Sequence, residues 1–452
     1  MSEIQVRGLL GRFDHEIAFP EADEFIILHG PNGVGKTMLL ELIRALSGPL
    51  QLYNLFRVPF AEVRLGYSDG SSLKVCRRSH KQMALQPEED AEFTTQQLLF
   101  TLSRPGFPEV PSQVEFNTDE YNSARFRDWA SRILGVEAVD RDAWLIGTGE
   151  VISTVDLVYR YADKISARSP RWAGEKVALE IRKFAGQNHV HLIETQRLLT
   201  WPTPEPGEYR RSTQSVAMSK VEEFARDLAR RLAEALAENS RTSQELDRTY
   251  PRRVLQVRSD APSEEQIEQR YAEQNELRKA LSAISLLDEK VGKIDIPQKM
   301  ADWQRNVLWA YLEDTEKKLS TFSELLAKVS LLREIINSRF LYKTLEIDRR
   351  RGLLLKSDDR VELGLSMLSS GEQHELVLVY DLLFNVQPGA LVLIDEPEIS
   401  LHISWQKRFI DDLRRISQLV EFRSVVATHS PQIASRWRSR MVSLGPDADE
   451  AE

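Results

Sequence analysis

The first 80 residues alternate between patterns typical of strands and patterns typical of helices. Apolar and polar residues alternate over positions 4–6, and Phe25–Leu28 is a continuous apolar run, so both segments are predicted to be strands. Residues 37–48 carry apolar side chains at helical spacing and end in a Ser-Gly-Pro segment, which predicts a helix. Val63–Leu65 and Leu73–Val75 flank the turn-forming sequence Ser-Asp-Gly-Ser and are predicted to pair as a hairpin.

The same mixture of patterns returns near residue 190 and again after residue 343. In chain order, the pattern predicts a strand at Val190–Ile193, short strands from 343, a helix near 372–384, a buried strand at Leu391–Ile394, a helix near 403–418 and a strand at Ser424–Val426. Between the first two regions, three prolines at positions 105, 108 and 111 indicate a loop. Both ends of the chain are therefore predicted to be α/β.

The middle of the chain has a different pattern. From about 214 to 340 it is rich in Ala, Leu, Glu and Arg, and its apolar residues recur at steps of three and four, which predicts helices. We expect Pro251 and Pro262 to interrupt this helical region. After Pro297 the apolar spacing is close to a heptad, which predicts one long helix whose ~40 residues would extend ~60 Å.

These changes of pattern define the expected domains. Residues 1–200 and 343–445 are expected to form the two parts of one α/β domain, with an insertion at about 85–185. Residues 205–340 are expected to form a helical or coiled-coil arm, and residues 446–452 an acidic tail.

Composition narrows the functional classes. The 452 residues are 42% apolar, and 60 Lys and Arg against 69 Asp and Glu give a formal net charge of −9. That balance excludes a uniformly basic nucleic-acid-binding surface but leaves room for a local basic patch. The single cysteine, Cys76, excludes an intramolecular disulfide. Because no window approaches ~18 consecutive apolar residues and no signal-peptide pattern opens the chain, we expect a soluble cytoplasmic protein without a membrane partner.

The segment Gly-Pro-Asn-Gly-Val-Gly-Lys-Thr at 30–37 matches the phosphate-binding loop G-x-x-x-x-G-K-[ST]. It lies between a predicted strand and a predicted helix, where glycines let backbone N–H groups face phosphate oxygens and the helix start adds its positive end. We expect Lys36 to reach the β- and γ-phosphates of ATP and Thr37 to bind Mg²⁺. The candidate ATP-binding residues of this loop are Gly30, Asn32, Gly33, Gly35, Lys36 and Thr37.

Two further motifs supply the remaining parts of a nucleotide site. Asp395, at the carboxyl end of a buried strand, is expected to bind Mg²⁺, and Glu396 to polarise the attacking water as general base. Ser370 and Gly371 lie in the sequence Leu-Ser-Ser-Gly-Glu-Gln at a predicted helix start, which is a second anion-binding terminus. Because a phosphate held by the first loop does not need a second helix start from its own subunit, we expect these two residues to contact a phosphate bound by another subunit.

Together with Ala-Thr-His-Ser at 427–430 and Asp-Glu-Pro-Glu-Ile-Ser-Leu-His at 395–402, these motifs resemble the head of ABC-type ATPases of the RecF, SMC and OLD-like group. The resemblance covers about 1–80, 190–200 and 343–435. It implies an α/β fold, namely an ABC-ATPase head (a P-loop NTPase sheet with an antiparallel β subdomain) interrupted by a helical or coiled-coil insertion.

The resemblance also implies residue roles and assembly. In such heads two ATP molecules are bound between two subunits, so it implies a homodimer and a higher homo-oligomer in which Ser370 and Gly371 act in trans and Ser400 lies at the dimer seam. His429 becomes a switch histidine near the γ-phosphate, and Gln196 a contact of Mg²⁺ and water. Three other glutamines compete for that last role, namely Gln82, Gln96 and Gln97.

Among these ATPases, the layout is most similar to the ATPase subunits of two-component antiphage systems, above all those of the PARIS type (AriA) and next those of the Septu type. That similarity implies a separate nuclease effector, of TOPRIM type first and HNH type second, and a phage product as trigger. The alternative is a RecF/SMC-like repair ATPase that clamps DNA directly. Basic clusters such as Arg349–Arg351 would contact phosphates in that case and are otherwise solvated faces.

Overall fold

A computed structural model gives the fold of the chain. The residues that it describes are 1–19, 24–81, 94–116, 123–140, 143–147, 149–154, 157, 160–161, 177–194, 199–200, 218–255, 261–287, 297, 299–399, 401–434 and 436–445. Of the residues expected in a site, Gln196, Ser400 and the competing Gln82 lie outside this set.

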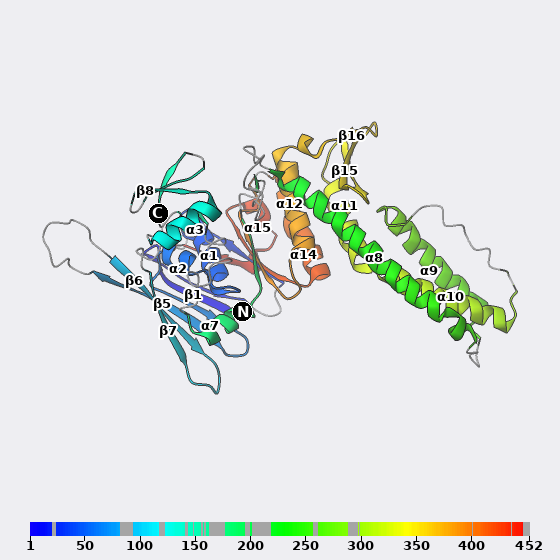
Figure 1. Cartoon of the computed structure of the whole chain (residues 1–452), viewed down its shortest axis with the longest axis horizontal. Helices are drawn as coiled ribbons and strands as arrows, with labels where there is room; N and C mark the ends of the chain where they lie inside the picture. Colours follow the sequence, from blue (N-terminus) through cyan, green and yellow to red (C-terminus); the bar gives the residue numbers. More distant parts are fainter. Residues whose placement is uncertain are drawn as a thin grey trace. The chain divides into compact units, whose positions relative to one another are not determined.

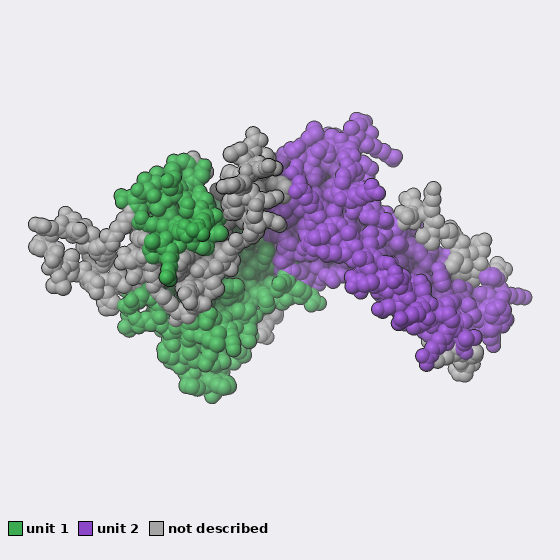
Figure 2. Space-filling view, viewed as in Figure 1, with its two compact units in different colours: residues 1–195, 387–399, 421–452 green, residues 196–386, 400–420 purple. Residues whose placement is uncertain are grey.

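The chain divides into two compact units (Figure 2). Unit 1 comprises Met1–Thr195, Gln387–Ile399 and Glu421–Glu452, and unit 2 comprises Gln196–Val386 and Ser400–Val420. The chain therefore enters unit 2 twice and returns to unit 1 each time. The domain boundaries expected from the sequence follow a different division and stay a prediction.

Unit 1 contains a six-stranded antiparallel sheet with the strand order β2-β1-β4-β5-β6-β7. Four of its strands, β1, β5, β6 and β7, are labelled in Figure 1. Its strands are β1 (Glu3–Leu9), β2 (Phe13–Ala18), β4 (Glu62–Gly66), β5 (Ser72–Lys81), β6 (Thr94–Ser103) and β7 (Val110–Phe116). The predicted hairpin is confirmed, because Val63 pairs with Val75 and Leu65 with Leu73. The prolines 105 and 108 lie in the β6–β7 connection, but Pro111 lies inside β7, an edge strand where a missing N–H is tolerated.

The second large sheet of unit 1 is parallel and carries the predicted buried runs. Its order is β11-β17-β18-β3-β19, made of β11 (Val190–Ile193), β17 (Leu391–Asp395), β18 (Arg423–Thr428), β3 (Phe25–His29) and β19 (Met441–Ser443). All four pairings are parallel. The carboxyl ends of β3, β18 and β17 therefore lie at one edge, where ligands of parallel α/β sheets are usually bound.

Helices and a small satellite sheet complete unit 1. Helix α1 (Lys36–Leu46) buries Leu39, Leu40, Leu42 and Ile43 in the main core, beside α2 (Leu52–Arg57) and α7 (Leu179–Gly186). Inside the expected insertion, α3 (Ala124–Leu134) and the strands β8 (Glu137–Asp140), β9 (Ala143–Leu145) and β10 (Val151–Ser153) surround a core of their own around Phe126 and Trp144. Short helices α15 (Pro431–Ala434) and η3 (Arg438–Arg440) follow β18.

Unit 2 is built mainly of helices. They are α8 (Lys220–Leu255), α9 (Glu264–Ser282), α10 (Asp302–Ser320), α11 (Ser323–Asn337), α12 (Ser370–Phe384), α13 (Ile403–Gln406) and α14 (Phe409–Val420). A three-stranded antiparallel sheet of β14 (Lys343–Asp348), β15 (Gly352–Ser357) and β16 (Glu362–Leu363) lies before the short helix η2 (Leu365–Met367). The two-residue strands β12 (Leu199–Thr200) and β13 (Met218–Ser219) pair with each other.

Two expectations about the helical region were wrong. Pro251 does not interrupt the helix but lies inside α8, close to hydrogen bonds from the Thr249 hydroxyl and the Arg253 guanidinium to the Leu246 carbonyl. The long helix expected after Pro297 is two helices, α10 and α11. The carbonyl of Lys318 accepts a hydrogen bond from the Asn239 amide of α8 at 2.6 Å, and this contact accompanies the break.

An aromatic and ionic contact joins α12 to α8. Tyr380 is fully buried, stacks on Phe224 of α8 at 4.4 Å between centroids, and donates its hydroxyl to Asp227 at 2.7 Å. Although burial alone would raise it, hydrogen bonds from Arg231, Tyr380 and Arg230 hold the pKa of Asp227 below its usual value. The first helix of the arm is thus packed directly against the helix that begins at Ser370.

The observed sheets confirm the predicted α/β fold, with a parallel sheet, an antiparallel β subdomain and a helical insertion. The strands predicted from apolar runs and the helix after the glycine-rich loop are all present. In the described part of the chain, every helix is too short or too polar to span a lipid bilayer.

Candidate functional site

The glycine-rich loop connects β3 to α1 at the carboxyl edge of the parallel sheet. Gly33 and Gly35 have φ values of 89° and 90°, a left-handed conformation that glycine adopts without strain. A Cβ on Gly30 would stand 2.2 Å from the Leu444 carbonyl oxygen, whereas one on Gly33 would meet no atom within 4 Å. The loop is therefore packed tightly at its start and open at Gly33, as a backbone cradle for phosphate requires.

Lys36, the first residue of α1, folds back over this loop. Its ammonium donates to the carbonyls of Gly30 at 2.7 Å and Pro31 at 3.0 Å, and the residue is only 5% exposed. Behind the loop, Nε2 of the buried His15 lies 3.1 Å from the Val34 carbonyl oxygen. A buried positive charge held by neutral carbonyls gains free energy when an anion binds beside it.

Thr37 and Asp395 are 358 positions apart in sequence and meet in unit 1. The Thr37 hydroxyl donates to Oδ2 of Asp395 at 2.9 Å, and Oδ1 lies at 3.2 Å. Asp395 ends β17 and is 6% exposed. A hydroxyl and a carboxylate supply the hard oxygen donors that Mg²⁺ prefers, and Mg²⁺ usually completes its shell with water and substrate phosphate.

Such a site differs from an all-protein metal cage. Among the residues that the structure describes, no group of three or more His, Cys, Asp and Glu side chains could hold a metal ion. The hydroxyl of Thr37 and the carboxylate of Asp395 fit a Mg²⁺ ion that also contacts a bound phosphate.

Glu396 begins a strained turn directly after β17. Its φ is 44°, which is uncommon for a residue with a side chain, and its N–H donates to the Ala427 carbonyl of β18 at 2.9 Å. Its Oε1 lies 3.6 Å from Nδ1 of His429, which follows β18. Because β18 lies between β3 and β17, the structure brings Glu396 and His429 to the same sheet edge as Thr37 and Asp395.

Glu398 is a residue of this region to which the sequence analysis assigned no role. It is 7% exposed, and its Oε1 accepts hydrogen bonds from the Thr428 hydroxyl at 2.7 Å and from the N–H groups of His429 and Ser430 at 2.9 and 3.1 Å. Its place two residues after Glu396 is the signal that could have indicated it. Nothing in the sequence pattern shows that the chain turns back toward β18 there.

Ser370 and Gly371 lie in unit 2, at the first turn of α12. The residue before them, Ser369, forms a capping box in which its hydroxyl accepts from the Glu372 N–H and its own N–H donates to the Glu372 carboxylate at 2.8 Å. The ammonium of Lys343 donates to the same carboxylate at 2.8 Å. Although burial alone would raise it, Lys343 and Ser369 hold the pKa of Glu372 below its usual value.

A cavity of about 810 Å³ opens beside this helix start, within unit 2. The residues that line it are Ser338, Arg339, Leu341, Ser369, Ser370, Gly371, Glu372, Leu401, His402, Ser404, Trp405 and Arg408. Of these lining residues, the buried Arg339 pairs through its guanidinium with Glu375 of α12 and Asp412 of α14. Burial lowers the pKa of Arg339 and raises that of Asp412, so this ionic cluster is strongly desolvated.

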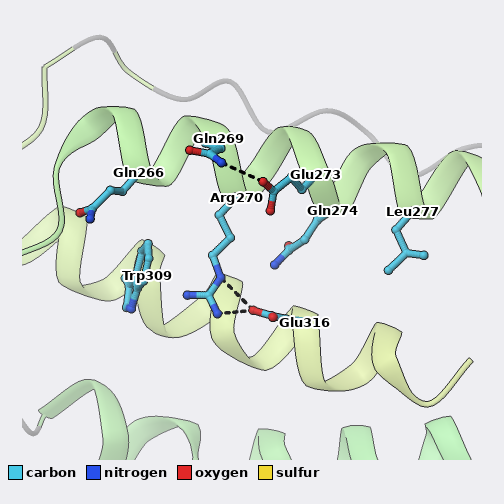
Figure 3. A pocket seen from close by; sticks show the side chains of 8 residues that line it. All are labelled: Gln266, Gln269, Arg270, Glu273, Gln274, Leu277, Trp309 and Glu316. Carbon is cyan, nitrogen blue, oxygen red and sulfur yellow. Dashed lines mark hydrogen bonds and ion pairs between the residues drawn. The ribbon is translucent and has the colours of Figure 1, made fainter. Parts of the chain in front are cut away.

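A second cavity, of about 440 Å³, lies between α9 and α10 of the arm (Figure 3). Arg270 of α9 reaches toward α10, where its Nε donates to Glu316 at 2.9 Å and its guanidinium lies 4.4 Å from the ring centroid of Trp309. Gln274 donates to the Leu312 carbonyl at 2.7 Å. These contacts hold the two helices together, and none of the motif residues lines this cavity.

Four arginines of the basic clusters, at positions 77, 253, 349 and 351, have partners within the chain. Arg77 donates to the carbonyls of Leu55, Phe56 and Val58 at the end of α2, and Arg349 donates to those of Ser285 and Leu286. Arg351 pairs with Glu362, and Arg253 with Asp314. Among the competing glutamines, Gln97 donates to Glu115 on the neighbouring strand.

Parts of the chain are similar to ATPase domains of known proteins. Residues 227–435 match the family described as "AAA domain, putative AbiEii toxin, Type IV TA system". This match begins after the glycine-rich loop and includes the α12 start, the acidic strand and His429. Over 114 residues the chain is 31% identical to the "Retron Ec83 probable ATPase" of Escherichia coli. This aligned region covers 23% of the chain and 21% of that protein. The chain thus spans about a fifth of the length of this curated relative.

Solved SMC head domains are similar over nearly the whole chain, at low identity. The Pyrococcus furiosus SMC head with an extended coiled coil, bound to the C-terminal domain of ScpA, is 11% identical, with 98% of this chain and 92% of that chain covered and a TM-score of 0.33. The Thermotoga maritima SMC head is 13% identical, with 96% and 90% covered and a TM-score of 0.30. The fold described above rests on strand order and loop geometry rather than on these values.

Proposed function

We propose that this chain binds and hydrolyses ATP as a subunit of a homodimeric, ABC-type ATPase. The hydrogen bond between Thr37 and Asp395 carries the proposal, because it joins the glycine-rich loop to the acidic strand across 358 positions of sequence. Loop glycines with positive φ, an adjacent lysine and an acid pair at one sheet edge are what phosphoryl transfer from a nucleotide requires.

Each residue has a separate part in the proposed reaction. The N–H groups of the loop and the ammonium of Lys36 bind the phosphates, and Thr37 and Asp395 would hold Mg²⁺. When bound, the cation neutralises charge on the phosphates. The carboxylate of Glu396 accepts a proton from the attacking water. His429, 3.6 Å from that carboxylate, contacts the γ-phosphate or the same water. Gln196 remains a proposed contact of the cation.

The α12 start would complete the site of a second copy. Ser370 and Gly371 lie beside an open cavity in unit 2, whereas the loop, the acid pair and His429 belong to unit 1. We infer that the first turn of α12 contacts the phosphate held by the partner, with Ser400 near the seam between the copies. A higher homo-oligomer would be built from such dimers.

The proposed setting is antiphage defence, with the chain controlling a separate nuclease of TOPRIM type or, second, of HNH type, as the likeness to PARIS AriA suggests. The family description, which names a toxin of a toxin–antitoxin system, and the retron ATPase relative support this setting. Direct clamping of DNA is the alternative, but Arg77, Arg349 and Arg351 of the basic clusters are engaged by backbone carbonyls or a carboxylate within the chain.

The test is Mg²⁺-dependent phosphate release by the full-length chain. Asp395→Asn should lower turnover by about 100-fold or more, since it weakens both the cation site and the contact to Thr37. Asp358→Asn, in an exposed turn of unit 2, is the matched control, and its turnover should equal that of the wild type. Equal turnover in Asp395→Asn and the wild type would contradict the proposal.

The proposed setting in antiphage defence is tested separately. The complex purified from its native host should contain a nuclease, and a salt-dependent DNA affinity of the chain alone would favour direct clamping of DNA.

A further inference from the structure

Glu398 is a buried carboxylate to which the proposed reaction gives no part. The turn that begins at Glu396 closes with a hydrogen bond from the Ile399 N–H to the Glu396 carbonyl at 3.2 Å. Glu398, inside this turn, reaches β18, where one of its oxygens accepts from the Thr428 hydroxyl and from the N–H groups of His429 and Ser430. Because three successive residues donate to a single oxygen, Glu398 fixes the backbone on which His429 is carried.

The same oxygen also faces the imidazole ring. Nδ1 of His429 lies 3.2 Å from Oε1 of Glu398 and 3.6 Å from Oε1 of Glu396. Ionised carboxylate oxygens accept hydrogen bonds and cannot donate them. In a neutral ring, the proton is therefore favoured on Nδ1, and Nε2 carries the lone pair.

We propose that Glu398 is a positioning residue, which holds the backbone of His429 and keeps its neutral ring in the Nδ1–H form, so that Nε2 is the atom offered to the bound nucleotide. This inference rests on the proposed function, because it concerns the same site. Glu398 acts only through His429 and does not itself contact the substrate. Its loss should therefore lower kcat while leaving the binding of ATP to the loop largely intact.

The test combines ring spectroscopy with kinetics on the full-length chain. Nitrogen-15 NMR of labelled histidines reports which ring nitrogen carries the proton, and the His429 signal is identified by its loss in His429→Asn. Glu398→Met removes every acceptor at similar size, whereas Glu398→Gln keeps one oxygen acceptor and loses the charge. The matched control is Glu62→Gln on β4, which changes a carboxylate that pairs with Lys74 of β5.

We expect Glu398→Met to lose the Nδ1–H preference and to lower kcat about 10- to 100-fold, with KM for ATP within about threefold of the wild type. Glu398→Gln should keep the ring form and recover most of kcat, and Glu62→Gln should match the wild type. The inference is overturned if Glu398→Met keeps both the ring form and kcat, or if kcat falls equally in Met and Gln variants with the ring form unchanged.

Two further outcomes remain decisive. If Glu398→Met does not fold, Glu398→Gln decides alone: persistence of the Nδ1–H form supports the inference, and a change to Nε2–H overturns it. If the wild type hydrolyses no ATP, the proposed function fails, while the ring form in the wild type and the variants still tests the position of Glu398.

Discussion

Two helix starts carry the candidate phosphate contacts, that of α1 in unit 1 and that of α12 in unit 2. They differ in how their first N–H groups are satisfied. The residue before α1 is Gly35, in a left-handed conformation and without a side chain to cap the helix. Helix α12 is closed by its own capping box, in which Ser369 and Glu372 satisfy each other's N–H groups. One start is open to an external anion, and the other already has internal acceptors.

This difference shows that the positive end of a helix dipole can either bind an external anion or be neutralised within the chain. At α1, the free N–H groups and the buried Lys36 make a strong site for phosphate on their own. At α12, the carboxylate of Glu372 places negative charge in the first turn, and Lys343 is needed to balance it. We therefore expect α12 to add to a phosphate that is already held elsewhere rather than to recruit one alone.

The largest effect should appear beside α1, at the acid pair. Glu396→Gln removes the proposed general base, so kcat should fall about 10²- to 10⁴-fold while KM for ATP stays within about threefold. Steady-state phosphate release measures both parameters, with Glu180→Gln on α7 as control. Turnover unchanged in Glu396→Gln would remove this residue as the base.

Next in size is the loss of charge at the open helix start. Lys36→Ala removes a buried ammonium that would bind phosphate by charge-assisted hydrogen bonds, each about 1.5–3 kcal/mol, so ATP affinity should fall about 10- to 150-fold. Titration calorimetry gives the affinity. Lys74→Ala, which breaks a pair with Glu62 on the antiparallel sheet, should bind ATP like the wild type. An equal affinity in Lys36→Ala would mean that α1 does not hold the phosphates.

A smaller effect should distinguish the capped helix start. Ser369→Ala deletes the hydroxyl that accepts the Glu372 N–H, and the loss of such a cap costs about 1 kcal/mol of unfolding free energy. Denaturant unfolding followed by circular dichroism measures this cost, with the exposed Ser366→Ala as control. If the two alanine variants unfold alike, the capping box does not stabilise α12.

The smallest effect concerns pH. Burial alone would raise the pKa of Glu372, but the hydrogen bonds with Lys343 and Ser369 and the charge of Lys343 outweigh it and hold the pKa below its ordinary value of 4.5. A carboxyl with a lowered folded pKa stabilises the fold above its unfolded pKa and loses that contribution as pH falls through the folded one. The stability difference between wild type and Glu372→Gln should therefore shrink below about pH 4.5. A difference that is constant down to acid unfolding would contradict the ionic role of Glu372.

Local patterns were enough to predict most of the head, but not contacts made across the fold. The strand at Leu391–Ile394 and the loop at 30–37 have signals confined to a few residues, and both are present as predicted. The break between α10 and α11 is accompanied by a contact from Asn239 of a helix distant in sequence, which the spacing of apolar residues does not reveal, so the spacing predicted one continuous helix. Glu398 was missed for the same reason, since its partners at 428–430 are adjacent only after β17 and β18 have paired.

The central claim is that the open start of α1 in one copy works with the capped start of α12 in another. It is tested by measuring ATP hydrolysis in an equal mixture of two inactive variants, Lys36→Ala and Ser370→Arg. If the copies exchange freely as isologous dimers, half of the dimers carry one site with both parts intact, and the mixture should regain about a quarter of wild-type turnover. A mixture that stays as inactive as either variant, although the copies are shown to exchange, would contradict the shared site.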